Sequence, residues 1–305
     1  MRYVVTGAAG FIGSQLLQVL LERGHDAVGW DSFTDYYDPA LKEENARALP
    51  VQRIDVAEDA LELDGVDGVF HLAGQPGVSS FGDVFPVYVR QNVLASRRLF
   101  EASAAAGART IFASSSSIYG DAETYPTPED TMPRPLSPYG ISKLACEHLA
   151  YAYGQEFGLD YVVLRYFTIF GPRQRPDMAL ARMVSCLAGN RAFELYGDGT
   201  DSRSFTYVDD AIDATIRAME GGSSRQTYNV GGGEEVSVLE AIEALGDIAG
   251  RRLELVRAPR RKGDSRRTAA DTSRIRTETD WEPQTPFVQG LAAQWRWAAD
   301  RVATP

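Results

Sequence analysis

The first thirteen residues of this 305-residue chain constrain its fold more than any other segment. Residues 2–6 have the pattern of a short buried strand, and residues 11–21 repeat apolar side chains at helical spacing. Gly7, Gly10 and Gly13 occupy the junction. A strand, a glycine turn and a helix in this order bind the pyrophosphate of a dinucleotide, because the N-terminal end of a helix attracts anions. The spacing predicts a parallel α/β sheet with a bound dinucleotide, and a plain turn is the alternative.

The end of the second predicted strand indicates which dinucleotide binds. This strand spans residues 26–31, and Asp31 follows Gly13 by eighteen positions. Dinucleotide-binding folds place a ribose-binding carboxylate about 20 residues beyond the glycines. The charge of Asp31 would repel a ribose 2′-phosphate, so the sequence favours NAD over NADP. A turn or cap role for Asp31 is the alternative.

The order of predicted elements gives the fold class. Up to about residue 170, strands alternate with helices, which predicts an α/β fold with a Rossmann-type, doubly wound parallel sheet. Beyond it, shorter elements and glycine-rich turns predict a smaller C-terminal substrate-binding lobe. We expect an NAD-binding domain at 1–170 and mainly a substrate lobe at 171–305, with segments that can exchange between them. Further strands are expected at 51–54, 66–72, 109–114 and 161–165, and helices at 86–106 and 138–157.

A tyrosine and a lysine four residues apart form the candidate catalytic base. Tyr139 and Lys143 lie in the helix expected at 138–157, where this spacing points both side chains the same way. A phenol accepts a proton at neutral pH only where a nearby positive charge stabilises the phenolate, and the Lys143 ammonium supplies that charge. On a surface helix the same pair would be only a solvated polar stripe.

The charge distribution bears on the ligand. A net charge of −11 argues against nucleic acid as the main partner. Residues 251–267 nevertheless contain eight basic residues and two acidic ones. This cluster predicts an anionic ligand, and a solvated basic face is the alternative.

The sequence also predicts a cytoplasmic protein without a membrane span. No apolar run is long enough to cross a bilayer, and no signal sequence precedes the first strand. Cys146 and Cys186 are expected to be reduced, buried thiols. The three histidines are not arranged to bind a metal, so no metal site is predicted.

Several motifs together resemble the extended short-chain dehydrogenase/reductase family, and within it the NAD-dependent nucleotide-sugar epimerases. Besides the glycine turn and the Tyr-x-x-x-Lys pair, they are residues 55–56, 71–75, 114–120, 197–199 with Arg203, 207–210 and 261–264. The resemblance covers essentially the whole chain.

The resemblance implies a mechanism. NAD⁺ would take a hydride from sugar C4 while Tyr139 takes the hydroxyl proton, and the 4-keto sugar would turn over and receive the hydride on its other face. Ser115 would hydrogen-bond the reacting oxygen, and Lys143 would also bind the nicotinamide ribose. Asp55 and Val56 would hold the adenine end. The implied cofactor contacts are Gly7, Gly10, Phe11, Ile12, Gly13, Asp31, Asp55, Val56, Leu72, Ala73, Gln75, Asn92, Tyr139 and Lys143.

Three segments resemble the UDP-glucuronate 4-epimerases more than the glucose enzymes, namely 35–42, 165–168 and 171–179. In those relatives the residue matching Arg175 lies by the sugar carboxylate, which suits a bidentate cation. Arg203 and Arg261 would clamp the substrate diphosphate. The implied substrate contacts are Ser116, Ser117, Thr168, Arg175, Arg203, Arg261 and Asp264.

Ser116 and Ser117 distinguish this chain from two related reaction types. Uronate decarboxylases typically place a glutamate at the position of Ser117, and 4,6-dehydratases place an Asp-Glu pair at both positions. This chain has neither acid at these positions. The two hydroxyls could instead hold the sugar carboxylate in an orientation unproductive for decarboxylation. The predicted reaction is therefore epimerisation of UDP-glucuronate to UDP-galacturonate. Serines that merely satisfy backbone groups are the alternative.

Two departures leave other substrates open. Ser79 stands where uronate epimerases often carry arginine, and the small Thr268 falls where relatives vary a residue near the sugar. A UDP-glucose or UDP-N-acetylglucosamine 4-epimerase and a UDP-glucuronate decarboxylase remain alternatives. A non-catalytic NAD-binding sensor is a remote one, because a fold does not prove turnover.

Two predicted helices suggest a homodimer. The helices at 86–106 and 138–157 are too apolar for burial on one face only, and relatives pair these helices across a dimer interface. Ordinary packing on the sheet is the alternative. The expected partners are a UDP-sugar substrate and a second copy of the chain.

Overall fold

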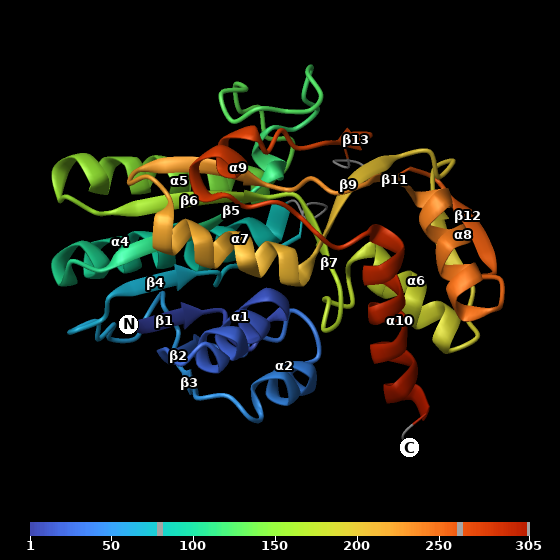
Figure 1. Ribbon diagram of the computed structural model, residues 1–305, viewed down its shortest axis with the longest axis horizontal. Coiled ribbons are helices and arrows are strands. Elements are labelled where there is room, and N and C mark those ends of the chain that lie inside the picture. Colours follow the sequence, from blue (N-terminus) through green and yellow to red (C-terminus); the bar gives the residue numbers. More distant parts are fainter. Residues whose placement is uncertain (78–81, 261–264, 304–305) are drawn as a thin grey trace.

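The structure is a computed structural model that describes residues 1–77, 82–260 and 265–303, so Ser79, Arg261 and Asp264 lie outside the described residues. It contains a seven-stranded sheet in the order β10-β6-β5-β4-β1-β2-β3, in which neighbouring strands are parallel (Figure 1). This order confirms the predicted Rossmann-type sheet. The strands are β1 Arg2–Thr6, β2 Asp26–Asp31, β3 Val51–Arg53, β4 Gly68–His71, β5 Arg109–Ser115, β6 Tyr161–Tyr166 and β10 Gln226–Val230.

Successive residues along the strands pack into cores on opposite faces of this sheet. Val5 and Phe70 belong to one core, together with residues of helices α1 and α7. Val4 and Val69 belong to another, together with residues of α4. Both faces are therefore covered, which explains the nearly continuous apolar runs of the strands. The helices around the sheet are α1 Phe11–Glu22, α2 Pro39–Ala46, α4 Ala95–Ala106, α5 Pro138–Glu156, α7 Val208–Gly221 and α9 Ser273–Thr279.

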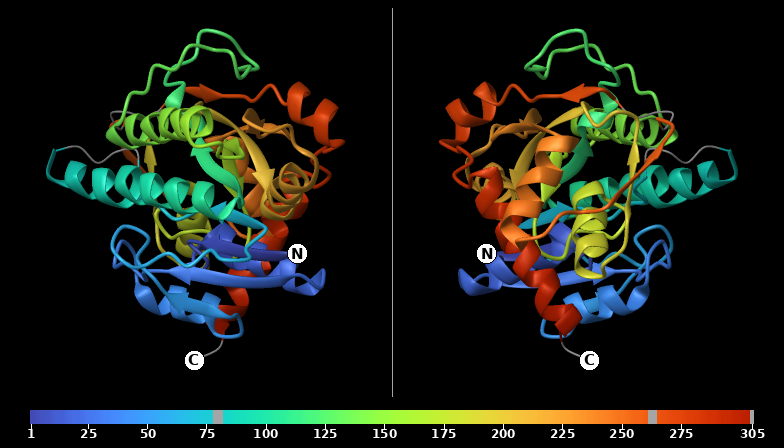
Figure 2. Two further views of the ribbon diagram at one scale, coloured as in Figure 1. Left: turned by 90° about the vertical axis from the view of Figure 1, so that its left-hand side faces the viewer. Right: turned by 90° about the vertical axis from the view of Figure 1, so that its right-hand side faces the viewer.

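A second part of the molecule has its own core. Helices α6, α8 and α10 enclose it with short strands beside the end of the large sheet (Figures 1 and 2). The helices are α6 Ala179–Ala188, α8 Val238–Ala249 and α10 Phe287–Ala303, and the strands are β7 Thr168–Phe170, β8 Phe193–Tyr196, β9 Ser202–Tyr207, β11 Glu235–Ser237, β12 Leu255–Ala258 and β13 Arg267–Thr268.

The structure differs from the sequence prediction at several elements. The strand expected at 66–72 is only Gly68–His71, because the Val66 N–H instead bonds the Leu63 carbonyl in a turn. The helix expected at 86–106 begins at Phe85 and is interrupted by a π-helix. It comprises α3 Phe85–Tyr88, the π-helix η2 Val89–Leu94, and α4, and the short 3-10 turn η1 Gly82–Val84 precedes it.

Beyond residue 170 the chain passes between the two parts of the molecule more than once. Strand β10 and helix α7 come from beyond that position, yet β10 pairs with β6 in the large sheet and α7 packs on it. The large sheet is thus completed by a segment that follows the first strands of the smaller part.

Candidate active site

A cavity of about 630 Å³ lies between the carboxyl ends of the parallel strands and the smaller part of the molecule. Ligands of doubly wound sheets bind at this edge. Most of the predicted site residues line it: Gly7, Gly10, Phe11, Ile12, Gly13, Asp31, Val56, Leu72, Ala73, Gln75, Ser115, Ser116, Ser117, Tyr139, Lys143, Thr168, Arg175 and Arg203.

The glycine turn is shaped by close backbone approaches. Gly7 has φ +71°, and a Cβ there would lie 2.9 Å from the Ala73 nitrogen. A Cβ at Gly13 would lie 2.2 Å from the Gly7 carbonyl oxygen, so only glycine lets α1 begin this close to the turn. The first N–H groups of a helix have no acceptor within it. In α1 these N–H groups belong to residues that line the cavity, and the first turn carries no acidic side chain. They are therefore suited to bind a pyrophosphate.

Asp31 ties this turn to the end of β2. Its Oδ2 accepts a hydrogen bond from the Ala9 N–H at 3.0 Å, and its Oδ1 accepts one from the Phe33 N–H at 2.7 Å. Each carboxylate oxygen can accept a second bond. Asp31 therefore has a turn role and still has capacity to bind a ribose hydroxyl at the cavity.

Asp55 and Asn92 are predicted cofactor contacts that do not line the cavity. Asp55 accepts hydrogen bonds from the Ala57 N–H and, at 2.7 Å, from Arg90. Asn92, in the π-helix η2, accepts from the Gln75 N–H at 2.7 Å and donates to the Gln75 carbonyl and to Ser142. Asn92 thus fixes the cavity wall from behind.

Tyr139 and Lys143 lie one turn apart at the start of α5, as the spacing predicts. Ser137 caps this helix by accepting a hydrogen bond from the Gly140 N–H at 3.1 Å. The buried Lys143 ammonium donates to the Ala113 carbonyl at 2.8 Å and lies 6.0 Å from the centre of the Tyr139 ring. The lysine is thus anchored on β5 with its charge beside the phenol.

The serines after β5 form a short turn at the cavity. The Ser115 hydroxyl accepts a hydrogen bond from the Ser117 N–H at 3.1 Å and donates to the Ser117 hydroxyl at 3.0 Å. A Cβ at Gly140 would lie 2.6 Å from the Ser117 carbonyl oxygen, so this turn packs directly on α5. The structure therefore brings the three serines and Tyr139 to one cavity wall.

Two of the predicted substrate arginines, Arg175 and Arg203, are engaged with protein groups. Arg203 donates to the Ser202 carbonyl at 2.8 Å and to the Ser265 carbonyl at 2.6 Å. Arg175 donates through Nε and Nη2 to Asp177 at 3.0 and 3.1 Å.

Other cavity residues were not predicted as site residues. They include Tyr36, Tyr37, Lys42, Asp177 and Arg260. The buried Lys42 ammonium donates to the carbonyl and the hydroxyl of Thr34 at 2.8 and 2.9 Å, and burial lowers its pKa. For the first three, the only signal in the sequence is the resemblance of segment 35–42 to the uronate epimerases.

His71 is a buried residue behind the glycine turn. Thr6 accepts a hydrogen bond from the Ala73 N–H at 3.1 Å, and its hydroxyl lies 2.8 Å from His71 Nδ1. The other ring nitrogen, Nε2, lies 3.0 Å from the Ser96 hydroxyl. A neutral imidazole with its hydrogen on Nε2 fits these partners. Burial, followed by the nearby charge of Lys143, lowers the pKa of His71 to about 3.

This depressed pKa predicts an acid-labile fold. The unfolded chain binds a proton at His71 below about pH 6.5, whereas the folded protein does not until about pH 3. Stability is therefore lost as pH falls between these values, by about 2 kcal/mol at pH 5. Urea unfolding of His71→Gln should lack this part of the pH dependence, and the exposed His148→Gln should retain it. Parallel pH profiles for wild type and His71→Gln would contradict the assignment.

Within residues 1–77, 82–260 and 265–303, no group of three or more His, Cys, Asp or Glu side chains is placed to hold a metal ion. Over the same part of the chain, no helix combines the length and apolar character needed to cross a membrane.

Fold and cavity together define a dinucleotide-binding enzyme with a Tyr-x-x-x-Lys pair. The profile of the NAD dependent epimerase/dehydratase family matches residues 3–231, about three quarters of the chain. The chain belongs to this family, which confirms the resemblance seen in the sequence.

Individual relatives cover nearly the whole chain. An uncharacterized UDP-glucose epimerase of Bacillus subtilis, YtcB, is 40% identical over 95% of this chain and 96% of its own length. A UDP-glucuronate 4-epimerase of Thermodesulfobacterium geofontis is 32% identical over 98% of this chain and 97% of its own. The crystal structure of UDP-glucuronic acid 4-epimerase from Bacillus cereus, in complex with UDP-glucuronic acid and NAD, superposes with a TM-score of 0.95 at 37% identity, covering 99% of this chain and all of that one.

Proposed function

We propose that this protein is an NAD-dependent 4-epimerase that interconverts UDP-glucuronate and UDP-galacturonate. The family is NAD-dependent, and the open glycine turn and Asp31 suit that cofactor. The uronate epimerases among the relatives support this substrate.

The chain's own residues would divide the work as follows. Bound NAD supplies reversible uptake and return of a hydride. Tyr139 takes the proton of the C4 hydroxyl and later returns it, with Lys143 supplying the adjacent positive charge. The Ser115 hydroxyl holds the reacting oxygen, and Arg203 and Arg261 bind the diphosphate.

One observation carries the choice of a uronate. Arg175 lines the same cavity as Tyr139, Ser116, Ser117 and Thr168, so a cation and three hydroxyls share the cavity of the candidate base. A planar guanidinium and hydroxyl donors suit a carboxylate. Positions 116 and 117 carry no acid to act on the carbon next to that carboxylate, which favours epimerisation over decarboxylation or dehydration.

A specific observation favours a second candidate, a UDP-glucose 4-epimerase. Asp177 already occupies two N–H groups of Arg175, which leaves that cation partly neutralised. A neutral sugar would need no further cation. The Bacillus subtilis relative is named as a UDP-glucose epimerase.

Proton NMR distinguishes these candidates. The protein with bound NAD is incubated separately with UDP-glucuronate, UDP-glucose and UDP-N-acetylglucosamine, and the signals of sugar C1 and C4 are followed. We expect galacturonate signals without a pentose product. Conversion of a neutral or acetylated sugar alone would retain the mechanism but reject the uronate, and a pentose would indicate decarboxylation.

We also propose a homodimer formed through α3, η2 and α5. These helices pack against one another and expose several large apolar side chains: Phe85, Val87, Val89, Leu94, Ile141 and Tyr151, with the exposed Phe157 directly after α5. Burial of such a surface by a second copy would be favourable. Light scattering after gel filtration should give twice the chain mass, and a monomer at micromolar concentration would reject the dimer.

A cytoplasmic location is part of the same proposal. Cys146 and Cys186 are both free thiols; Cys146 is buried as predicted, whereas Cys186 is only partly buried. Unpaired thiols are usual in a reducing compartment.

A further inference from the structure

Arg175 is held by a carboxylate of its own segment before any substrate is considered. Asp177 accepts hydrogen bonds from Nε at 3.0 Å and from Nη2 at 3.1 Å, which is a side-on bidentate pair. Both residues line the cavity that contains Tyr139. The Arg175 side chain is 26% exposed and that of Asp177 is 36% exposed, so solvent screens their pairing only in part.

A contact from a distant segment restrains Asp177. The Tyr36 hydroxyl donates to Asp177 Oδ2 at 3.3 Å. Burial, followed by the charge of Asp177, raises the pKa of Tyr36 to about 12, so the phenol stays protonated as a donor. Tyr36 is itself confined, because a Cβ at Gly77 would lie 2.9 Å from its oxygen. Asp177 is therefore tied to a second wall of the cavity.

The backbone supports this arrangement on both sides. Phe33, three residues before Tyr36, has φ +51°, and Arg173, two residues before Arg175, has φ +63°. Non-glycine residues in this region persist only where the surroundings hold them. Arg173 is held by hydrogen bonds to Ser14 and Gln18 of α1. The segment that carries Arg175 and Asp177 is thus fastened to α1 through Arg173.

The Arg175–Asp177 pair affects the binding of a charged sugar differently from that of a neutral sugar. A guanidinium has five N–H donors, of which Asp177 takes two, so a second carboxylate can still bind its other edge. That second carboxylate would be repelled by Asp177, whereas an uncharged sugar would not. Burial lowers the pKa of Arg175, but the charge and hydrogen bonds of Asp177 outweigh this and hold it above the ordinary value, so the cation itself remains.

We propose that Asp177 is a specificity-determining residue, which tethers Arg175 and limits how tightly the cavity holds the carboxylate of a uronate. The inference rests on the proposed function, because it concerns the ligand of the same arginine. An epimerase must let its oxidised sugar turn between two orientations. An unopposed guanidinium would bind the carboxylate strongly in one of them, which stabilises a ground state without helping turnover.

Binding measurements on Asp177→Asn test the inference. In a Tyr139→Phe background with bound NAD, calorimetry gives Kd for UDP-glucuronate and UDP-glucose without turnover. We expect Asp177→Asn to tighten UDP-glucuronate by about tenfold, the size expected for removing a like charge that shares one guanidinium with the substrate in a partly solvated site. The Kd of UDP-glucose should change less than about twofold, since it carries no sugar charge.

A matched control separates this effect from a general change of charge. Asp35→Asn removes the same charge one residue before Tyr36, from an exposed side chain that does not line the cavity. It should leave both Kd values unchanged. Equal shifts for the two ligands, or an unchanged or weaker Kd for UDP-glucuronate in Asp177→Asn, would overturn the inference.

Turnover gives a second readout that a merely structural role would not reproduce. With Tyr139 present, Asp177→Asn should lower both KM and kcat for UDP-glucuronate, because tighter ground-state binding is not matched in the transition state. A raised KM with unchanged kcat would contradict the tether. If the unmodified protein does not convert UDP-glucuronate, the proposed function fails, but the calorimetric comparison still decides the role of Asp177.

Discussion

Tyr139→Phe should lower kcat by about 10³-fold while leaving NAD bound. The substitution removes the group that accepts the C4 hydroxyl proton, and positioned general bases contribute about 10²- to 10⁴-fold. It keeps the ring, which lies 6.3 Å from the ring of the buried Tyr88, so the wall of the cavity should persist. Turnover is followed by proton NMR, and bound cofactor by chromatography after denaturation.

A second tyrosine of the same helix serves as the control. Tyr151 lies on α5 and is 59% exposed, so Tyr151→Phe removes a hydroxyl far from the candidate chemistry. It should retain wild-type turnover and cofactor content. If Tyr139→Phe kept more than about a tenth of wild-type kcat, Tyr139 would not be the base.

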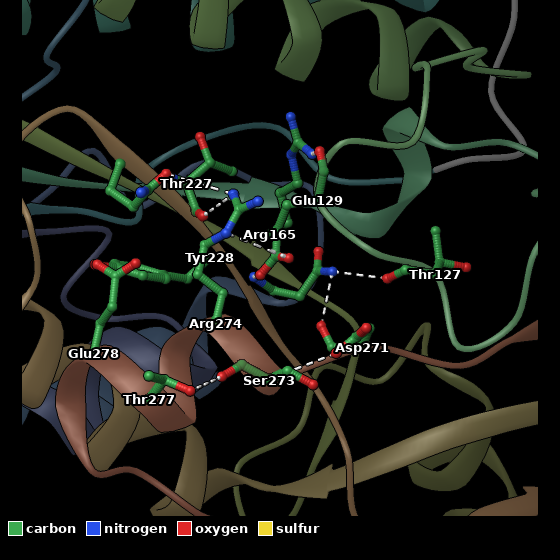
Figure 3. A network of polar contacts seen from close by, with 12 residues as sticks. Thr127, Glu129, Arg165, Thr227, Tyr228, Asp271, Ser273, Arg274, Thr277 and Glu278 are labelled. Atoms are coloured by element: carbon green, nitrogen blue, oxygen red, sulfur yellow. Dashed lines mark hydrogen bonds and ion pairs between the residues drawn. The ribbon is translucent and has the colours of Figure 1, made fainter.

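Arg165→Met should destabilise the protein by about 3–5 kcal/mol, as expected when one partner of a buried ion pair is removed. Arg165 and Glu147 form a bidentate pair at 3.1 and 2.7 Å, with both side chains only 9% exposed. Arg165 also donates to the Glu129 carbonyl and to Tyr119. Figure 3 shows Arg165 near Glu129 and Arg274 in the surrounding polar network. Burial lowers the pKa of Arg165, but Glu147 outweighs it and raises that pKa, so the guanidinium keeps its charge.

Urea unfolding at pH 7 measures this loss. Arg97→Met breaks an exposed pair with Glu101 on α4 and should cost less than about 1 kcal/mol. The double variant Arg165→Met with Glu147→Met should recover much of the loss, since no unpaired charge remains buried. A cost below about 1 kcal/mol for Arg165→Met would show that water or another group compensates Glu147.

The residues that the sequence identified most clearly act over short distances along the chain. The glycine turn joins one strand to the helix that follows, and Tyr139 and Lys143 are one helical turn apart. Steric limits on the backbone and the period of the helix fix both arrangements locally. The alternation of strands and helices likewise predicted the parallel sheet, because parallel strands need crossover connections.

The tertiary structure alone decided contacts between segments far apart in sequence. Tyr36 donates a hydrogen bond to Asp177, and Asp177 in turn holds Arg175. From the sequence, Arg175 was only a cation available to the substrate. Asn92 lies in a π-helix, and its side chain bonds the backbone of Gln75. Helical periodicity in the sequence predicts neither feature. Strand β10 completes the sheet from beyond residue 170. Hydrogen bonds and ion pairs of this kind depend on side-chain positions set by packing, whereas local patterns report only which element a residue occupies.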